Sequence, residues 1–198
     1  MSIDGRTQLA FLLGYPVEHS LSPAMHQAAF AVTGLNAVYL PWSVAPAFLP
    51  DAVRGLRTFR NLLGANVTVP HKQAVIPLLD GLTPDAEAMG AVNTILCRED
   101  TLVGENTDGA GFLMSLRESV SVRRIPPLFD YAGLSAATVV CDLIYRPAET
   151  PLLAAARQQG CRTVNGLSML LHQGALAFER WVGRGAPIGA MRQALGLP

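Results

Sequence analysis

The chain has 198 residues, of which 50% are hydrophobic and 15% are charged, so it can bury a sizeable core. Fifteen basic residues balance fifteen acidic ones, and a net charge of zero argues against a surface for nucleic acid or an anionic membrane. No apolar run approaches the roughly 20 residues of a membrane-spanning helix, and the N-terminus lacks the pattern of a signal peptide. We therefore expect a cytoplasmic protein with no nucleic-acid or membrane partner.

Cysteine and histidine spacings indicate neither a disulfide framework nor a metal centre. The three cysteines, Cys97, Cys141 and Cys161, form no Cys-x-x-Cys pair, which is typical of reduced thiols packed as small hydrophobes. The four histidines match no zinc-binding pattern, so we expect no metal site.

The first part of the chain alternates strand patterns with helix patterns. Short apolar or alternating runs predict strands at 8–14, 37–44 and 66–69. Amphipathic patterns predict helices at 23–33, with Ser22 as N-cap and Pro23 at its first position, and at 47–60 and 71–79. The apolar face of the helix at 47–60 is expected to comprise Phe48, Leu49, Ala52, Val53 and Leu56. Two strand–helix units followed by a third strand favour a mostly parallel sheet covered by helices.

The second part of the chain begins with a helix at 84–90 and a hairpin, whose strands at 91–96 and 101–104 are joined across 98–100. A short helix from Phe112 leads into a basic, proline-containing break that includes Arg123 and Arg124. A strand at 138–143, a helix at 150–159 and a strand at 162–164 form one further unit. Two more helices are predicted at 168–182 and 188–195.

The stretch 66–72, Asn-Val-Thr-Val-Pro-His-Lys, places three polar groups together. Val67 and Val69 alternate with polar residues as in a half-buried strand, which Pro70 ends because it cannot donate to the ladder. Asn66, Thr68 and Lys72 would then lie at the carboxyl end of a strand, where open α/β sheets bind ligands. They could hold a polyhydroxylated molecule and move a proton. The alternative is an edge strand followed by a solvated lysine.

Further candidate residues follow the other strand ends. Ser20 and Ser22 precede a helix, although capping explains Ser22 equally well. Asn93 falls within a predicted strand, where its amide must be paired or near a ligand. Asp108 opens a helix, where helix physics alone favours capping.

Six separate stretches resemble motifs of the shikimate dehydrogenase family. In chain order they are GYPVEHSLSP (14–23), GANVTVPHK (64–72), GAVNT (90–94), GENTDG (104–109), DLIYRP (142–147) and GLSMLLHQ (166–173). Each motif alone is weak, but six in the right order are highly specific. The resemblance covers residues 8–115 and about 126–182.

The resemblance implies NADP-linked reduction of 3-dehydroshikimate to shikimate, a step of aromatic amino-acid biosynthesis. Lys72 and Asp108 would form the catalytic pair, and Lys72 would pass the proton. The resemblance assigns the substrate to Ser20, Ser22, Thr68, Asn93, Tyr145 and Gln173, and assigns cofactor contacts to Leu143 and Gly166. This chemistry is physically sound, because a cation beside a ketone oxygen stabilises the charge that develops during reduction. A neighbouring carboxylate keeps the lysine charged.

The chain departs from the family where a dinucleotide-binding domain is expected. The family has a glycine-rich turn for the pyrophosphate and a basic loop for the 2′-phosphate, and this sequence has neither. Only 25 residues separate Phe112 from Thr138, whereas one βαβ unit takes about 30 or more. Arg123 and Arg124 could bind a phosphate, but a solvated linker explains them better.

We therefore predict three parts. Residues 1–115 form a shikimate-binding catalytic domain, 116–137 a shortened linker, and 138–198 the remnant of a Rossmann domain with C-terminal helices. The expected fold class is α/β: a mostly parallel, three-layer substrate domain plus a remnant strand–helix–strand unit and those helices. Two strands alone are marginally stable, so we expect the remnant to pack against the first domain or a partner chain, for example in a homodimer.

Three hypotheses share this ancestry. The chain is a working dehydrogenase that binds NADP in a reduced fashion, a silent relative that binds shikimate-like ligands as a sensor or partner, or an internally deleted variant, natural or engineered. Without a positioned nicotinamide, hydride transfer loses an effective molarity worth roughly 7–11 kcal/mol. The sequence therefore favours retained substrate binding over turnover, and it leaves open the choice between shikimate and quinate.

Overall fold

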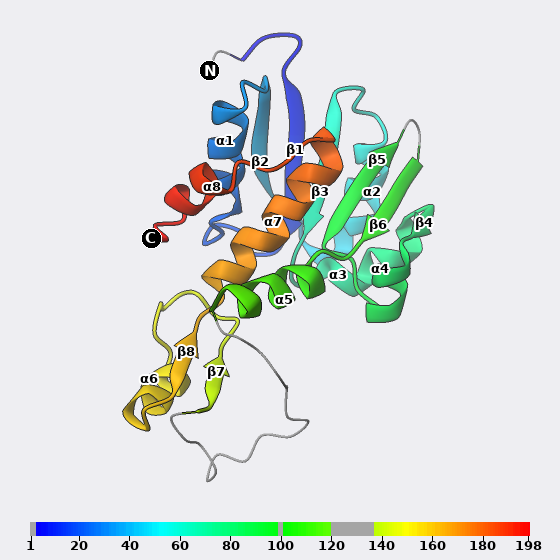
Figure 1. The fold of residues 1–198 in the computed structure, drawn as a ribbon. Coiled ribbons are helices and arrows are strands. Elements are labelled where there is room, and N and C mark those ends of the chain that lie inside the picture. Colours follow the sequence, from blue (N-terminus) through cyan, green and yellow to red (C-terminus); the bar gives the residue numbers. More distant parts are fainter. Residues whose placement is uncertain (1–2, 99–100, 120–136) are drawn as a thin grey trace.

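The computed structural model describes residues 3–98, 101–119 and 137–198, and its main feature is a six-stranded mixed sheet (Figure 1). The strand order is β2-β1-β3-β5-β6-β4. The strands are β1 (Gln8–Gly14), β2 (Ala37–Ser43), β3 (Leu62–Val67), β4 (Gly81–Leu82), β5 (Thr94–Arg98) and β6 (Thr101–Glu105). β1 pairs in parallel with β2 and β3, and β4 pairs in parallel with β6, whereas β5 is antiparallel to both β3 and β6. The predicted α/β class with a mostly parallel sheet is confirmed.

Helices cover both faces of this sheet, except for α6, which lies over a smaller unit. They are α1 (Ser22–Val32), α2 (Leu49–Leu56), α3 (His71–Ala74), α4 (Pro84–Met89), α5 (Asp108–Ser119), α6 (Pro151–Gln158), α7 (Leu167–Val182) and α8 (Ile188–Ala194). Side chains along β1 alternate between two hydrophobic cores. Phe11 and Leu13 pack in a core with α2, whereas Ala10 and Leu12 pack in a core with α1, α7 and α8. The period of two that predicts a strand therefore divides its residues between two hydrophobic layers.

The last two helices return to the N-terminal sheet. α7 and α8 pack on α1, and α7 also contacts β3 and β5 (Figure 1). Leu171 and Phe178 of α7 and Met191 of α8 are fully buried in the same cluster as Phe30 of α1. The end of the chain thus completes the core of its beginning. The three-part division of the chain stays a prediction.

A smaller unit lies beyond the main sheet, near the N-terminal end of α7 (Figure 1). Its strands β7 (Val139–Cys141) and β8 (Arg162–Val164) are parallel, and α6 covers them. Val140, Leu153, Ala156 and Cys161 form its small core. Within the described residues this unit packs chiefly on itself and not on the N-terminal sheet; the partner-chain alternative stays a prediction. Arg123, Arg124 and most of the predicted linker lie outside the described residues, as do residues 99–100 of the hairpin turn.

Three predicted elements end earlier than expected. β3 stops at Val67, so Thr68 and Val69 lie in the following turn, where Val69 is 69% exposed. The helix predicted at 71–79 breaks after Ala74 into a 3-10 turn, because Pro77 has no N–H to continue an α-helix. The helix predicted at 47–60 begins as a 3-10 turn and ends at Leu56, which leaves Phe48 64% exposed and outside the apolar face.

The start of α1 also differs from the prediction. Ser22 is its first helical residue and not its N-cap; that position belongs to Leu21, which makes no side-chain cap. The backbone N–H of Ser22 donates instead to Oγ of Ser20 at 3.2 Å. Ser20 therefore satisfies one of the free backbone N–H groups at the start of this helix.

None of the described helices combines the length and apolarity needed to cross a membrane. The described residues also contain no group of three or more His, Cys, Asp or Glu side chains arranged to hold a metal ion.

Candidate functional site

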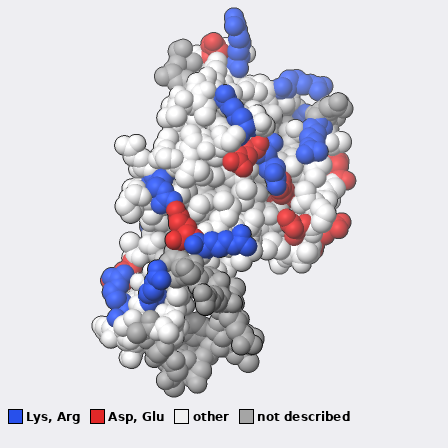
Figure 2. Space-filling view, viewed as in Figure 1, with Lys and Arg blue, Asp and Glu red and all other residues white. Residues whose placement is uncertain are grey.

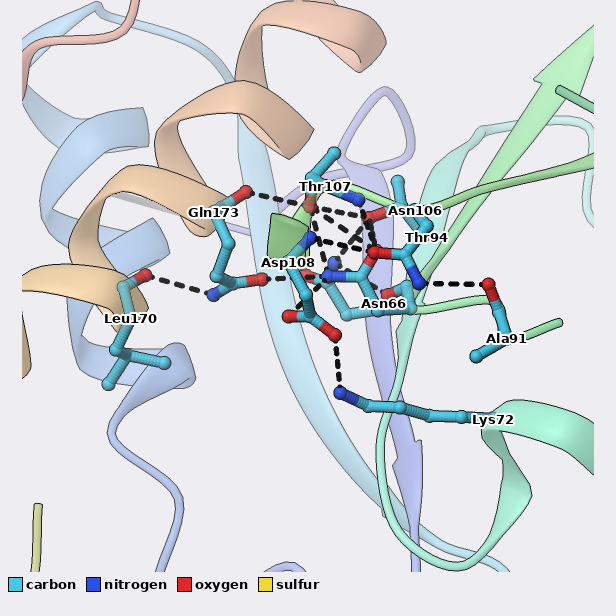
Figure 3. A network of polar contacts seen from close by, with 10 residues as sticks. Asn66, Lys72, Ala91, Thr94, Asn106, Thr107, Asp108, Leu170 and Gln173 are labelled. Carbon is cyan, nitrogen blue, oxygen red and sulfur yellow. Dashed lines mark hydrogen bonds and ion pairs between the residues drawn. The ribbon is translucent and has the colours of Figure 1, made fainter. Parts of the chain in front are cut away.

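Four predicted residues meet at one end of the central strands β3 and β5, and Figure 3 labels three of them, Lys72, Asp108 and Gln173. Lys72 lies in the first turn of α3, just beyond β3, and Asp108 is the first residue of α5. Asn93 immediately precedes β5 and is not within a strand as predicted, whereas Gln173 projects from α7. The carbonyl oxygen of Lys72 accepts from Val92 N at 2.8 Å, which joins α3 to the segment that carries Asn93. Residues from distant parts of the sequence therefore share one site.

Lys72 and Asp108 form a direct ion pair. Nζ of Lys72 lies 2.6 Å from Oδ2 of Asp108, and Oδ1 of the same carboxylate accepts from Nδ2 of Asn93 at 2.9 Å. Both oxygens of Asp108 therefore hold side chains, which argues against helix capping as the main role of this carboxylate. The side chains of Lys72 and Asp108 are 32% and 21% exposed, so a ligand can reach the ammonium group.

Asn93 is the centre of the polar network. It is 2% exposed, and its Nδ2 lies within hydrogen-bond distance of Oγ1 of Thr107, Oδ1 of Asp108 and Oε1 of Gln173, at 2.9, 2.9 and 3.2 Å. Its Oδ1 accepts from the backbone N–H of Thr107 at 2.8 Å. We expected this amide to be either paired or near a ligand. It is paired, and its bonds orient both Asp108 and Gln173.

Several residues of the network escaped the sequence analysis as site residues. Asn106 accepts from the backbone N–H of Asp108 at 2.9 Å and donates to the carbonyl of Ala91 at 2.9 Å, which fixes the start of α5. Thr107 also donates to the backbone carbonyl of Gln173 at 3.1 Å. Asn66, predicted above to face a ligand at the end of a strand, is instead buried within β3 beside Thr94. The available signal was burial, because a polar residue inside an apolar run must be hydrogen-bonded.

Ser20, Ser22 and Thr68 lie near the same edge of the sheet, outside the direct contacts of the Lys72–Asp108 pair. Ser22 is buried and hydrogen-bonds Tyr39, whereas Ser20 is bonded to the backbone of Ser22. The methyl group of Thr68 packs against Gly14 so closely that a Cβ at Gly14 would collide with it. Gly14 therefore permits the end of β1 to approach the turn after β3.

Tyr145, Leu143 and Gly166 belong to the smaller unit and its junction with α7. Tyr145 is half-buried, and burial raises the pKa of its hydroxyl above the usual value. Gly166 donates its N–H to the carbonyl of Ile144 at 3.2 Å, and a Cβ at this position would collide with the carbonyl of Leu143. The structure brings Leu143 and Gly166 together. Contact of Tyr145 with a substrate stays a prediction.

The described residues do not fit the pyrophosphate of a dinucleotide. Such a site needs a glycine-rich turn from a strand into a helix, so that backbone N–H groups face the phosphates. The connection from β7 to α6, residues 142–150, contains no glycine. Oγ1 of Thr150 accepts from the N–H of Leu153 and thus occupies one of the free donors at the start of α6. The contacts expected for Leu143 and Gly166 would therefore lack their usual anchor.

A cavity of about 390 Å³ lies away from this site, between α6, β8 and the ends of α5, α7 and α8. Among the arginines that line it, Arg157 forms an ion pair with Glu149, and Arg192 forms one with Glu118. Figure 2 shows basic and acidic side chains interspersed over the visible face, without a large area of one sign. The charges at this cavity are therefore largely matched within the protein.

Two protein-family models match this chain, one toward each end. The model of the shikimate dehydrogenase substrate binding domain matches residues 12–95, and that of the shikimate 5'-dehydrogenase C-terminal domain matches residues 166–195. The shikimate dehydrogenase (NADP(+)) of Carboxydothermus hydrogenoformans is 35% identical over 279 positions, which span 100% of this chain and 99% of that protein. The enzyme of Desulforamulus reducens is 36% identical, over 98% of this chain and 96% of that protein.

Solved structures give the same result. Shikimate 5-dehydrogenase from Thermus thermophilus in complex with shikimate has a TM-score of 0.86 and 28% identity, over 96% of this chain and 98% of that chain. The enzyme from Listeria monocytogenes in complex with shikimate and NAD has a TM-score of 0.85 and 29% identity, over 98% of both chains. The sequence alignment of 279 positions exceeds the 198 residues of this chain, so part of the Carboxydothermus protein has no counterpart here.

The matched family models, the full-length relatives and the solved structures agree with the six motifs and with the sheet that carries them. This chain belongs to the shikimate dehydrogenase family.

Proposed function

We propose that this protein binds shikimate or 3-dehydroshikimate at the Lys72–Asp108 site and that the isolated chain has lost efficient NADP-linked reduction. The observation that carries the proposal is the ion pair itself, at 2.6 Å, together with the amide network that orients it. The same chain has no glycine-rich turn for a pyrophosphate. In this proposal the protein keeps the substrate site of the family and lacks its cofactor site.

The site supplies the groups that a polyhydroxylated carboxylate needs. Lys72 donates to the oxygen at ring position 3, and in reduction its proton would pass to that oxygen. Asp108 orients the ammonium group through their ion pair. Asn93 and Gln173 offer amides to ring hydroxyls, and each hydroxyl that binds without a partner would weaken binding.

The remaining substrate contacts are assigned by family resemblance. Ser20, Ser22, Thr68 and Tyr145 would hold the carboxylate and hydroxyl groups of the substrate. Ser20, Ser22 and Thr68 lie at the same edge of the sheet as Lys72, which supports their assignment. Tyr145 would have to reach the substrate from the β7–α6 connection.

Ligand-dependent stability tests substrate binding directly. Shikimate should raise the unfolding temperature of the protein, because a ligand present at 100 times its Kd stabilises the folded state by about 2.7 kcal/mol. NADPH alone should not raise it. Lys72→Met should abolish most of the shikimate effect and serves as the matched control. If shikimate leaves the unfolding temperature unchanged at millimolar concentration, the proposed function is wrong. Quinate in a parallel series would define the substrate class.

A second candidate function is a working shikimate dehydrogenase, possessing both substrate and NADP sites. The observation in its favour is the exposed Lys72–Asp108 pair, since a protein that only binds its ligand has no need of a proton donor. Loss of NADPH absorbance in the presence of 3-dehydroshikimate would support this candidate. Lys72→Ala is the control, because turnover that survives this substitution would exclude Lys72 as the donor. Sedimentation of the active sample would show whether a second copy completes the site.

A further inference from the structure

A line of hydrogen bonds with one direction runs beneath the candidate site and ends at Asp108. The hydroxyl of Tyr39 on β2 donates to Oδ1 of Asn66 on β3 at 2.9 Å. Nδ2 of Asn66 donates to Oγ1 of Thr94 at 3.2 Å, and this hydroxyl donates to Oδ1 of Asn93 at 3.1 Å. Nδ2 of Asn93 then donates to Asp108 at 2.9 Å. Asn66, Thr94 and Asn93 each accept from one neighbour and donate to the next, so the bonds polarise one another toward the carboxylate.

The first donor in this line cannot readily turn away. Tyr39 is 4% exposed, and its ring stacks on His26 with centroids 4.5 Å apart and planes 5° apart. Trp181 of α7 lies against both rings, at 6.4 Å from Tyr39 and 5.4 Å from His26. Burial raises the pKa of the Tyr39 hydroxyl above its usual value, so the group keeps its proton; it donates to Asn66 and also hydrogen-bonds the side chain of Ser22.

The orientation of Asn66 follows from that fixed donor. An amide can present either its oxygen or its nitrogen, and only the oxygen can accept from Tyr39. Nδ2 of Asn66 is therefore directed toward the carbonyl of Asn93, at 3.1 Å, as well as toward Thr94. Asn66 is 5% exposed and, like Tyr39, lies below the groups that a ligand can touch.

We infer that Tyr39 and Asn66 are positioning residues for the substrate site: through Thr94 and Asn93 they hold the carboxylate of Asp108 in the geometry that pairs it with Lys72. This role rests on the proposed function for its biological meaning, but the hydrogen-bond line is a property of the ligand-free protein. Neither residue contacts the substrate or is a catalytic residue.

Tyr39→Phe tests the inference, because it removes one oxygen and leaves the aromatic stack in place. Since Tyr39 also hydrogen-bonds Ser22, a change in Kd supports the route through Asp108 only if Thr94→Val, which does not alter Tyr39, shares it. In the ligand-free full chain, NMR should show shifts of the Asn93 side-chain amide and the Asp108 carboxylate carbon. The Asn93 amide protons should also exchange faster with water. The Kd for shikimate should rise about three- to ten-fold, the equivalent of one buried hydrogen bond. Thr94→Val, which removes the central hydroxyl at nearly constant volume, should produce the same changes.

Phe178→Leu is the matched control. Phe178 is fully buried in the same hydrophobic cluster as Tyr39, so its truncation lowers stability without touching the hydrogen-bond line. It should leave the Asn93 and Asp108 resonances in place and the Kd within about twofold of the wild-type value.

Two results would overturn the inference: unchanged Asn93 and Asp108 resonances in Tyr39→Phe, or shifted resonances with an unchanged Kd for shikimate. If the wild-type protein does not bind shikimate at all, the proposed function fails separately, and the resonances of the ligand-free protein still decide the positioning role.

Discussion

Replacement of Asn93 by alanine should destabilise the protein and the site together. In the folded state, Oδ1 of Asn93 accepts from the buried N–H of Thr107, and Nδ2 donates to Asp108 and to Gln173. The loss of the acceptor for Thr107 N–H costs about 1–3 kcal/mol, and the loss of a bond to a charged group about 1.5–3 kcal/mol. Water that enters the vacated space recovers part of this. We expect the free energy of unfolding to fall by roughly 2–4 kcal/mol, a large fraction of the roughly 5–15 kcal/mol typical of a domain.

Urea unfolding followed by circular dichroism measures this change, provided that the slope with denaturant stays constant. Thr58→Ala is the control, because the hydroxyl of Thr58 donates to the carbonyl of Gly55 in an exposed setting. Thr58→Ala should therefore lower the free energy of unfolding by less than about 1 kcal/mol. A loss in Asn93→Ala no larger than that of the control would refute the reasoning. The Kd for shikimate should also rise by at least about tenfold, since Asp108 and Gln173 lose the partner they share.

Three further predictions concern His26, Lys72 and Gly111. Burial lowers the pKa of His26 to about 3, below its value of 6.5 in an unfolded chain. The contribution of this residue to the free energy of unfolding is therefore greatest above pH 6.5 and falls as the pH drops toward 3. The slope is at most about 1.4 kcal/mol per pH unit. Unfolding free energies measured near neutral pH and near pH 4.5 should therefore differ less in His26→Phe than in wild type; equal differences would contradict the prediction. Lys72→Met should change the free energy of unfolding by less than about 1 kcal/mol, because its ion pair is partly exposed; a loss above about 2 kcal/mol would show that the lysine is mainly structural. Gly111→Ala should lower the free energy of unfolding by about 1–3 kcal/mol, because the new Cβ would lie 2.7 Å from the backbone nitrogen of Gln173 and push α5 away from α7. Gly189→Ala, with open space at its Cβ, is the control. An unfolding temperature of Gly111→Ala equal to or above that of the wild type would disprove the clash.

Local signals predicted most elements well and failed where one residue changed the backbone. Strands β1 and β8 and helices α4, α6, α7 and α8 lie where periodicity and turn residues placed them. The helix expected at 71–79 failed at Pro77, and the strand expected through Val69 ended at Val67. Alternation of Asn66, Val67, Thr68 and Val69 resembles a strand, but only the first two residues belong to one. So short a stretch cannot show by its pattern where the chain turns.

The candidate site was predicted only in part. Lys72, Asn93, Asp108 and Gln173 were named from motifs, and the structure brings them into one hydrogen-bonded group. Thr107, Asn106 and Tyr39 lie in or beneath this group and were not predicted, because a hydrogen-bond partner on another strand leaves no mark on local sequence. Asn66 was predicted to face a ligand, but it is buried beneath the site. The contributions of Ser20, Ser22, Thr68, Tyr145, Leu143 and Gly166 to ligand binding stay predictions.

The sequence by itself determined the family, the order of strands and helices apart from the short strand β4, and the absence of a glycine-rich dinucleotide turn from the sequence. These properties reside in short contiguous stretches, where residue type and spacing act directly on the local backbone. Tertiary structure alone decided that α7 and α8 complete the core of the first sheet, and that Tyr39 and Asn66 lie beneath Asp108. Both facts depend on contacts between residues distant in sequence. Such contacts arise when burial of apolar faces brings strands and helices together, and the polar groups trapped between them must then find partners.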